Sequence, residues 1–132
     1  MQIIISESKS GKSYKADISK EKESEILGKK IGDKIDGGVF GAAGYELELT
    51  GGSDDSGFPM RDDVAGTRKM KALLTEGTGF HTKEKGQRRR KIVRGDTYSS
   101  EITQVNAKIV KAGPVSLDEL FKKEEKKEEE KK

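Results

Sequence analysis

The 132-residue chain has no cysteine and no tryptophan, and it contains only two prolines, one histidine and seven aromatic residues. The absence of cysteine excludes disulfides, thiolate metal sites and thiol nucleophiles, and it is typical of proteins from a reducing compartment. A single histidine without cysteine also argues against a zinc site of the usual composition. We therefore expect no metal site.

Long apolar runs are absent as well. None approaches the roughly 18 residues that a membrane-spanning helix needs, and the first twelve residues lack the basic region and apolar run of a secretory signal. Only 30% of the residues are hydrophobic, whereas 39% are charged. These features predict a cytoplasmic protein of one domain with a small core, no membrane partner and a large surface that faces water or a polar partner.

The net charge is only +3, but the charges are segregated along the chain. Residues 45–63 carry six acids and one base, a net −5, whereas residues 83–94, "KEKGQRRRKIVR", carry seven bases and one acid, a net +6. Guanidinium groups present a planar fork that suits phosphate oxygens. The candidate RNA-binding residues are Lys83, Lys85, Arg88, Arg89, Arg90, Lys91 and Arg94.

Two interpretations of this basic segment stay open from its composition alone: phosphate binding, or a solvated charged hairpin. Alternation in an extended chain places bases on both faces, which a strand with one buried face cannot accommodate. The start of the segment is therefore predicted to protrude, while Ile92 and Val93 enter the core. If about five of the bases neutralise phosphates, log affinity falls with log salt with a slope of about −4.

Short β-branched or alternating segments separated by glycine turns predict a mainly β protein. About six such strands, with at most one short helix before residue 112, favour a small closed barrel over residues 1–113, and a two-sheet sandwich is the alternative. Residues 114–121 are predicted to form a short docking helix, with Ser116 and Glu119 as a capping box. Residues 122–132 are all Lys or Glu and predict a solvated tail. The predicted strands are 2–6, 13–18, 45–50, 69–74, 88–95 and 101–111.

The stretch "GGSDDSGFPM" at residues 51–60 concentrates glycine, aspartate and proline in one loop. Glycines permit turns that other residues resist, and Asp or Ser side chains can bond the backbone of the same turn. The loop is interpreted either as a rigid connector or as a surface that contacts a partner. A calcium loop is a weaker alternative, because the alternating ligand spacing and the terminal glutamate are missing.

Catalytic signatures are not found. His81 has no nucleophile elbow or other motif around it, and "GKS" at residues 11–13 lacks the upstream glycine of a phosphate-binding loop. We expect no catalytic residue, no cofactor and no small-molecule substrate. His81, beside Lys83 and Lys85, is interpreted as an RNA contact or a plain surface residue.

Two motifs resemble those of the small-subunit ribosomal protein S6e family of archaea and eukaryotes. "LTGGSDDSGFPM" is similar to the family signature, and "GQRRRKIVRG" at 86–95 is similar to its basic block. The resemblance extends to about residue 111. Eukaryotic members of the family continue into a long basic helix that ends in a serine cluster, whereas no serine follows Ser116 here, so the chain resembles the archaeal-type short form. Signature positions are filled by Gly51, Gly52, Asp54, Gly57, Pro59 and Met60.

This resemblance implies a six-stranded barrel that is docked on ribosomal RNA as a structural constituent of the small ribosomal subunit. Small-subunit rRNA and neighbouring ribosomal proteins are then the expected partners. The competing hypothesis is a free-standing, translation-factor-like β-barrel module that binds proteins, since the glycine-rich stretch "GKKIGDKIDGG" is typical of such barrels. A hydrolase is a third class, and we expect no such activity.

Overall fold

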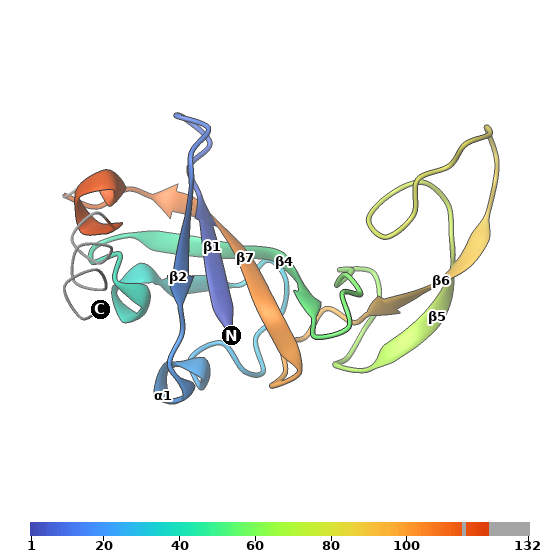
Figure 1. Cartoon of the computed structure of the whole chain (residues 1–132), viewed down its shortest axis with the longest axis horizontal. Coiled ribbons are helices and arrows are strands. Elements are labelled where there is room, and N and C mark those ends of the chain that lie inside the picture. The colour runs from blue at the N-terminus through green and yellow to red at the C-terminus, as the bar shows by residue number, and fades with distance from the viewer. Residues whose placement is uncertain (115, 122–132) are drawn as a thin grey trace, which may run out of the picture.

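The chain forms two β-sheets that follow one another along the long axis of the molecule (Figure 1). The computed structural model describes residues 1–114 and 116–121. In chain order the elements are β1 (Gln2–Ser6), β2 (Ser13–Asp17), α1 (Lys20–Glu23), β3 (Lys34–Asp36), the 3-10 turn η1 (Gly37–Phe40), β4 (Glu46–Asp54), β5 (Lys69–Leu74), β6 (Arg89–Arg94) and β7 (Ile102–Lys111).

The larger sheet has five strands in the order β2-β1-β7-β4-β3. Strand β1 pairs antiparallel with β2 and parallel with β7, and β4 pairs antiparallel with both β7 and β3. The smaller sheet consists of β5 and β6, which form an antiparallel hairpin, and Arg94 of β6 also makes an isolated parallel bridge with Met60. The predicted strands are confirmed to within a few residues, and the one predicted at 45–50 continues as β4 to Asp54.

The predicted closed barrel is wrong, because both sheets are open. A barrel needs every strand to have two neighbours, but β2 and β3 are the unpaired edges of the larger sheet. The glycine-rich residues 28–44 add no long strand that could close a barrel, since they contain the three-residue β3, η1, turns and one isolated bridge at Lys30. The sandwich alternative also fails, since the two sheets have separate apolar clusters rather than a shared core.

The main core lies on the five-stranded sheet and follows the alternation of its strands. Ile3 and Ile5 of β1 and Leu47 and Leu49 of β4 are fully buried, and their sequence neighbours are more exposed. Such period-2 burial is expected of strands with one covered face. From the other strands and the connecting segments the core receives, among others, Ile26, Phe40, Tyr45, Met60, Tyr98, Ile102 and Val105.

Residues 117–121 form a helical turn that packs against the same core. Leu117 and Phe121 are buried, and the ring of Phe121 stacks on Tyr14 of β2 with 5.2 Å between ring centroids. The Tyr14 hydroxyl donates a hydrogen bond to Asp118 Oδ1 at 2.6 Å, and chiefly this bond raises the pKa of Tyr14 to about 12. The predicted Lys/Glu-rich tail at 122–132 lies outside the described residues.

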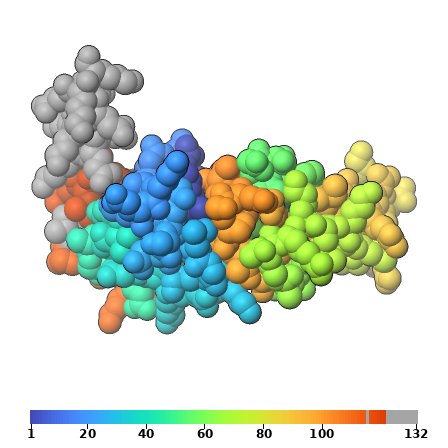
Figure 2. Space-filling view, turned by 90° about the horizontal axis from the view of Figure 1, so that it is seen from below, coloured from blue at the N-terminus to red at the C-terminus, as the bar shows by residue number. Residues whose placement is uncertain are grey.

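The β5–β6 hairpin and its long loop form one end of the elongated molecule (Figures 1 and 2). Its small apolar cluster consists of Leu74, Phe80 and Val93, with Val64 and Ala72 packed against it. Phe80 is therefore a core residue of the hairpin. Because this cluster is small, the position of the hairpin relative to the larger sheet depends on polar contacts at its base.

Candidate functional site

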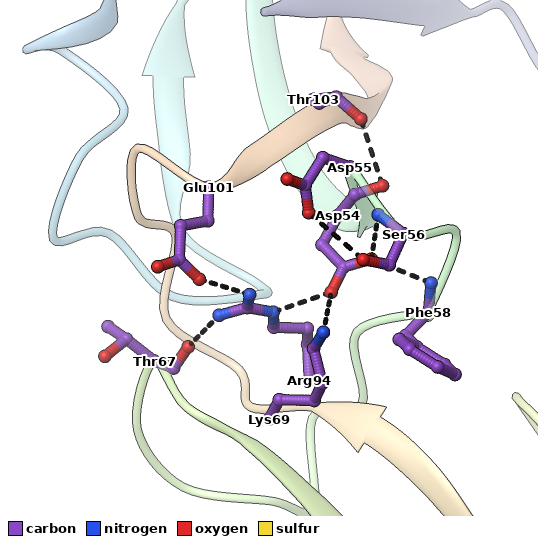
Figure 3. A network of polar contacts seen from close by, with 9 residues as sticks. All are labelled: Asp54, Asp55, Ser56, Phe58, Thr67, Lys69, Arg94, Glu101 and Thr103. Atoms are coloured by element: carbon purple, nitrogen blue, oxygen red, sulfur yellow. Dashed lines mark hydrogen bonds and ion pairs between the residues drawn. The ribbon is translucent and has the colours of Figure 1, made fainter.

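Asp54, in the signature loop, connects the two sheets (Figure 3). Its side chain is fully buried. Oδ1 accepts hydrogen bonds from the backbone N–H groups of Ser56 at 3.0 Å and Phe58 at 2.8 Å. Oδ2 accepts one from Arg94 Nε of β6 at 2.9 Å and lies 3.7 Å from Lys69 Nζ of β5. One carboxylate at the end of β4 thus holds its own loop and both strands of the hairpin.

Arg94 supplies the opposite charge, and its guanidinium points into the protein. Besides its bond to Asp54, Nη1 donates to the carbonyl oxygen of Thr67 at 2.9 Å, and Nη2 donates to the carboxylate of Glu101. Arg94 is only 5% exposed. Of the seven predicted RNA-binding residues, Arg94 is therefore the one whose charged group forms an ion pair with a described residue. We call the contacts of Asp54, Lys69, Arg94 and Glu101 the joint.

Both central residues of the joint remain charged although they are buried. Burial acts to raise the pKa of Asp54, but hydrogen bonds from Arg94 and from the Phe58 N–H, with the charge of Lys69, hold it below its ordinary value. For Arg94, burial acts to lower the pKa, and the bonds to Asp54 and Glu101 raise it above its ordinary value. Asp54 and Arg94 therefore form a buried ion pair at neutral pH.

The remaining signature positions close the loop on itself and on β6. The Met60 N–H donates to the Gly52 carbonyl at 3.0 Å, and the Arg94 N–H donates to the Pro59 carbonyl at 2.8 Å. Met60 is buried in the main core, and Gly57 turns the chain with a φ of 86°. These contacts lie within the protein and support the interpretation of the loop as a rigid connector.

The two glycines that begin the loop allow a matched test. A Cβ at Gly52 would meet the carbonyl oxygen of Gln104 in β7 well inside contact distance, whereas a Cβ at Gly51 would have no atom within 4 Å. We expect Gly52→Ala to lower the free energy of unfolding by about 1–3 kcal/mol, the usual cost of overpacking. Gly51→Ala should change it by no more than about 0.5 kcal/mol. Thermal denaturation of the two variants measures the difference, and equal melting temperatures would contradict this account of Gly52.

The other six predicted RNA-binding residues lie together on the hairpin and its loop. All six side chains are exposed, and none forms an ion pair with any residue that the structure describes. They lie at the end of the molecule farthest from β2 (Figure 1). We call this surface the basic end: Lys83, Lys85, Arg88, Arg89, Arg90 and Lys91.

The side chains of β6 alternate between two faces of the hairpin. Arg89 and Lys91 share a face with the buried Val93, and across the hairpin they pair with Leu74 and Ala72. Arg90 lies on the opposite face, where its cross-strand partner is Leu73, 61% exposed. The prediction that the segment begins exposed is confirmed, and Val93 enters the hairpin cluster fully buried, but Ile92 is only half-buried and belongs to neither apolar cluster.

Most acidic residues of the 45–63 segment are neutralised within the protein. Asp54 pairs with Arg94, and Asp63 accepts two hydrogen bonds of 2.9 Å from the guanidinium of Arg61. The remaining paired acids are Glu46 with Lys34 and Glu48 with Lys108. The positive charge of the basic end is therefore not offset by this acidic segment.

Sequence reasoning missed three basic residues near the hairpin. Arg61 holds the long loop, because its Nη1 donates to the Thr78 carbonyl at 2.6 Å. Arg68 and Lys71, just before and within β5, are exposed and form no ion pair with a described residue. The signal in the sequence was weak, since "RKMK" at 68–71 is short and lacks the arginine run of the later segment.

His81 is exposed in the loop between β5 and β6. Among residues 1–114 and 116–121, no group of three His, Asp or Glu side chains is placed to hold a metal ion. In the same ranges, no helix is long and apolar enough to cross a membrane.

Comparison with known proteins identifies the family. The sequence pattern of the family described as ribosomal protein S6e matches residues 1–122. The chain therefore belongs to the ribosomal protein S6e family. This confirms the resemblance inferred from the signature loop and the basic block.

Archaeal proteins named small ribosomal subunit protein eS6 are similar to this S6e chain over most of their length. The protein of Methanocella arvoryzae is 46% identical over 96% of this chain and 89% of its own. That of Methanococcus maripaludis strain C6 is 47% identical over 88% of this chain and 91% of its own. That of Methanocaldococcus jannaschii is 42% identical over 91% and 89%. Membership of a family of ribosomal proteins confirms the prediction that the chain is not an enzyme.

Proposed function

We propose that this S6e chain is a structural constituent of the small ribosomal subunit, in the cytoplasm, and that its basic end binds ribosomal RNA. Its relatives are named small ribosomal subunit proteins. The observation that carries the RNA-binding part is the basic end itself, where six exposed cations have no carboxylate partner among the described residues. Cations in this arrangement are free to replace the counterions of a phosphate backbone.

The joint gives this interface its rigidity. The buried Asp54–Arg94 pair fixes the hairpin to the larger sheet, so the cations of the basic end are presented in a defined orientation. Preorganised groups lose less conformational entropy on binding than groups on a mobile loop. The larger sheet, with its mixed surface charges, then faces solvent or neighbouring ribosomal proteins. Family membership does not favour the free-standing protein-binding module.

Salt dependence tests the proposal. If five of the six cations neutralise phosphates, the affinity of the purified chain for small-subunit rRNA should fall with a log–log slope of about −4. In a cell extract the chain should co-sediment with small subunits at moderate salt and leave them at high salt. A slope near zero, or a chain that stays at the top of the gradient at every salt concentration, would contradict it.

A further inference from the structure

The basic end contains a hollow of about 270 Å³ between β6 and the loop that precedes it. Arg89 and Lys91 line it from β6, and Phe80, His81, Lys83 and Gln87 line it from the loop. The loop is held over the strand because Phe80 is packed against Val93 in the hairpin cluster. Gly79 allows this approach, since its φ is 90° and a Cβ there would lie only 3.1 Å from Val93 Cγ1.

The lining of this hollow is distinguished by its charge. It has three cationic side chains and no carboxylate. Three other hollows in the surface of the described residues each include at least one acid: Asp36 and Glu46, Asp62, or Glu101. Glu84, the single acid of the 83–94 segment, does not line the hollow. The positive charge is therefore concentrated inside a concavity as well as on the outer surface.

Two side chains of the hollow, Lys91 and Gln87, have contacts that position them and still retain hydrogen-bonding capacity. Lys91 Nζ lies 5.9 Å from the centre of the Phe80 ring, which keeps the ammonium over the apolar floor. The Gln87 side-chain oxygen accepts a hydrogen bond from the Lys83 N–H at 3.2 Å, and this leaves its NH₂ group to donate to a ligand. The exposed ring of His81 lies at the rim, where a flat base could stack on it.

We propose that the hollow binds one unpaired nucleotide of the RNA, with its phosphate on Arg89, Lys91 and Lys83 and its base against His81 and Gln87. The proposal rests on the proposed function, because it presumes that RNA is the ligand of the basic end. A regular duplex can bring phosphates to the hollow but no base, because its bases are paired and stacked inside the helix. A nucleotide that projects from a bulge or loop can bring both, and such unstacked nucleotides are the usual targets of specific RNA recognition.

The alternation of β6 provides a matched pair of variants. Arg89→Gln/Lys91→Gln removes two charges from the hollow, and Arg88→Gln/Arg90→Gln removes two charges next to it on the same segment. The probe is a single-stranded tetra-uridine ribonucleotide. His81 is the only histidine of the chain, so its imidazole proton resonance reports occupancy of the hollow without further assignment.

We expect the probe to shift the His81 resonance saturably. The hollow variant should weaken this binding on the order of tenfold or more, since hydrogen bonds to a charged phosphate are lost, and the neighbouring variant should weaken it much less. Lys83→Gln, in an exposed loop, serves as a second hollow variant should the double variant misfold. A resonance that does not move, equal losses in both double variants, or an equal shift with inorganic phosphate alone would overturn the proposal.

The same variants distinguish failure of the hollow from failure of the proposed function. If both double variants weaken binding to small-subunit rRNA equally, the basic end binds phosphates without a nucleotide in the hollow. If neither variant weakens rRNA binding, the proposed interface itself is wrong.

Discussion

Replacing Asp54 with alanine is expected to lower the free energy of unfolding by about 3–5 kcal/mol, because it leaves a buried guanidinium without its main partner. The substitution also removes the acceptor for the N–H groups of Ser56 and Phe58. Domains of this kind are stable by only about 5–15 kcal/mol, so the melting temperature should fall by about 10–20 °C. Thermal denaturation followed by circular dichroism measures it.

Asp55 provides the matched control for Asp54. Its side chain is exposed, and the one hydrogen bond of that side chain among the described residues is a long contact of 3.5 Å from Ser56 Oγ. Asp55→Ala should therefore change the unfolding free energy by no more than about 0.5 kcal/mol. Equal destabilisation by the two substitutions would mean that the loop tolerates no change of side chain and that the ion pair is not the cause.

The stabilisation from Asp54 should also depend on pH. Its pKa is lower in the folded protein than in the unfolded chain, so its contribution is fully present above the unfolded value of about 4 and is lost as pH falls through the folded value. The difference in stability between the wild type and Asp54→Asn should thus be largest near neutral pH and should shrink below about pH 4. Asp63, whose pKa Arg61 also lowers, contributes acid sensitivity to both proteins and cancels in the difference.

Replacing Arg88, Arg89 and Arg90 together with alanine is expected to leave the chain folded and to impair its incorporation into small subunits. All three side chains are exposed and form no ion pair with a described residue. Their loss should reduce the log–log salt slope of rRNA binding by about 3, which corresponds to an affinity loss on the order of a hundredfold or more at 0.1 M salt. Filter binding across a salt series measures the slope, and gradient sedimentation measures incorporation.

The control for the arginine triple removes three other exposed cations. Lys15, Lys20 and Lys22 lie on β2 and α1, away from the basic end (Figure 1). Their replacement by alanine changes the net charge equally but should leave the salt slope nearly unchanged. Normal incorporation of the arginine variant, or an equal loss in the lysine variant, would contradict a local interface.

The strands of this protein were predictable because their signal is local. In β1 and β4 the alternation of apolar and polar residues follows directly from the pleat of a strand. The barrel was not predictable, because closure depends on which strands pair. β1 pairs with β7, which follows it by almost a hundred residues, and nothing in these two strands indicates that the pairing is parallel. Nor does the sequence of β5 and β6 indicate that they form a sheet of their own.

The candidate site, like the fold, was predictable from the sequence only in part. The basic segment could be recognised from its composition, and six of its seven cations are exposed. Arg94 could not be separated from the others, because alternation places it on the same face of β6 as the exposed Arg90. What removes Arg94 from the surface is Asp54, forty residues earlier in the chain.

The amino-acid sequence alone was sufficient to locate the strands other than β3, the family resemblance and the segment that carries the positive charge, because each of these depends on neighbouring residues. Only the tertiary structure decided that the sheets are open, that Asp54 of the signature loop forms the joint with the hairpin, and that part of the positive charge lines a hollow. The physical reason is that burial and ion pairing depend on segments that are distant in the chain and meet only after folding.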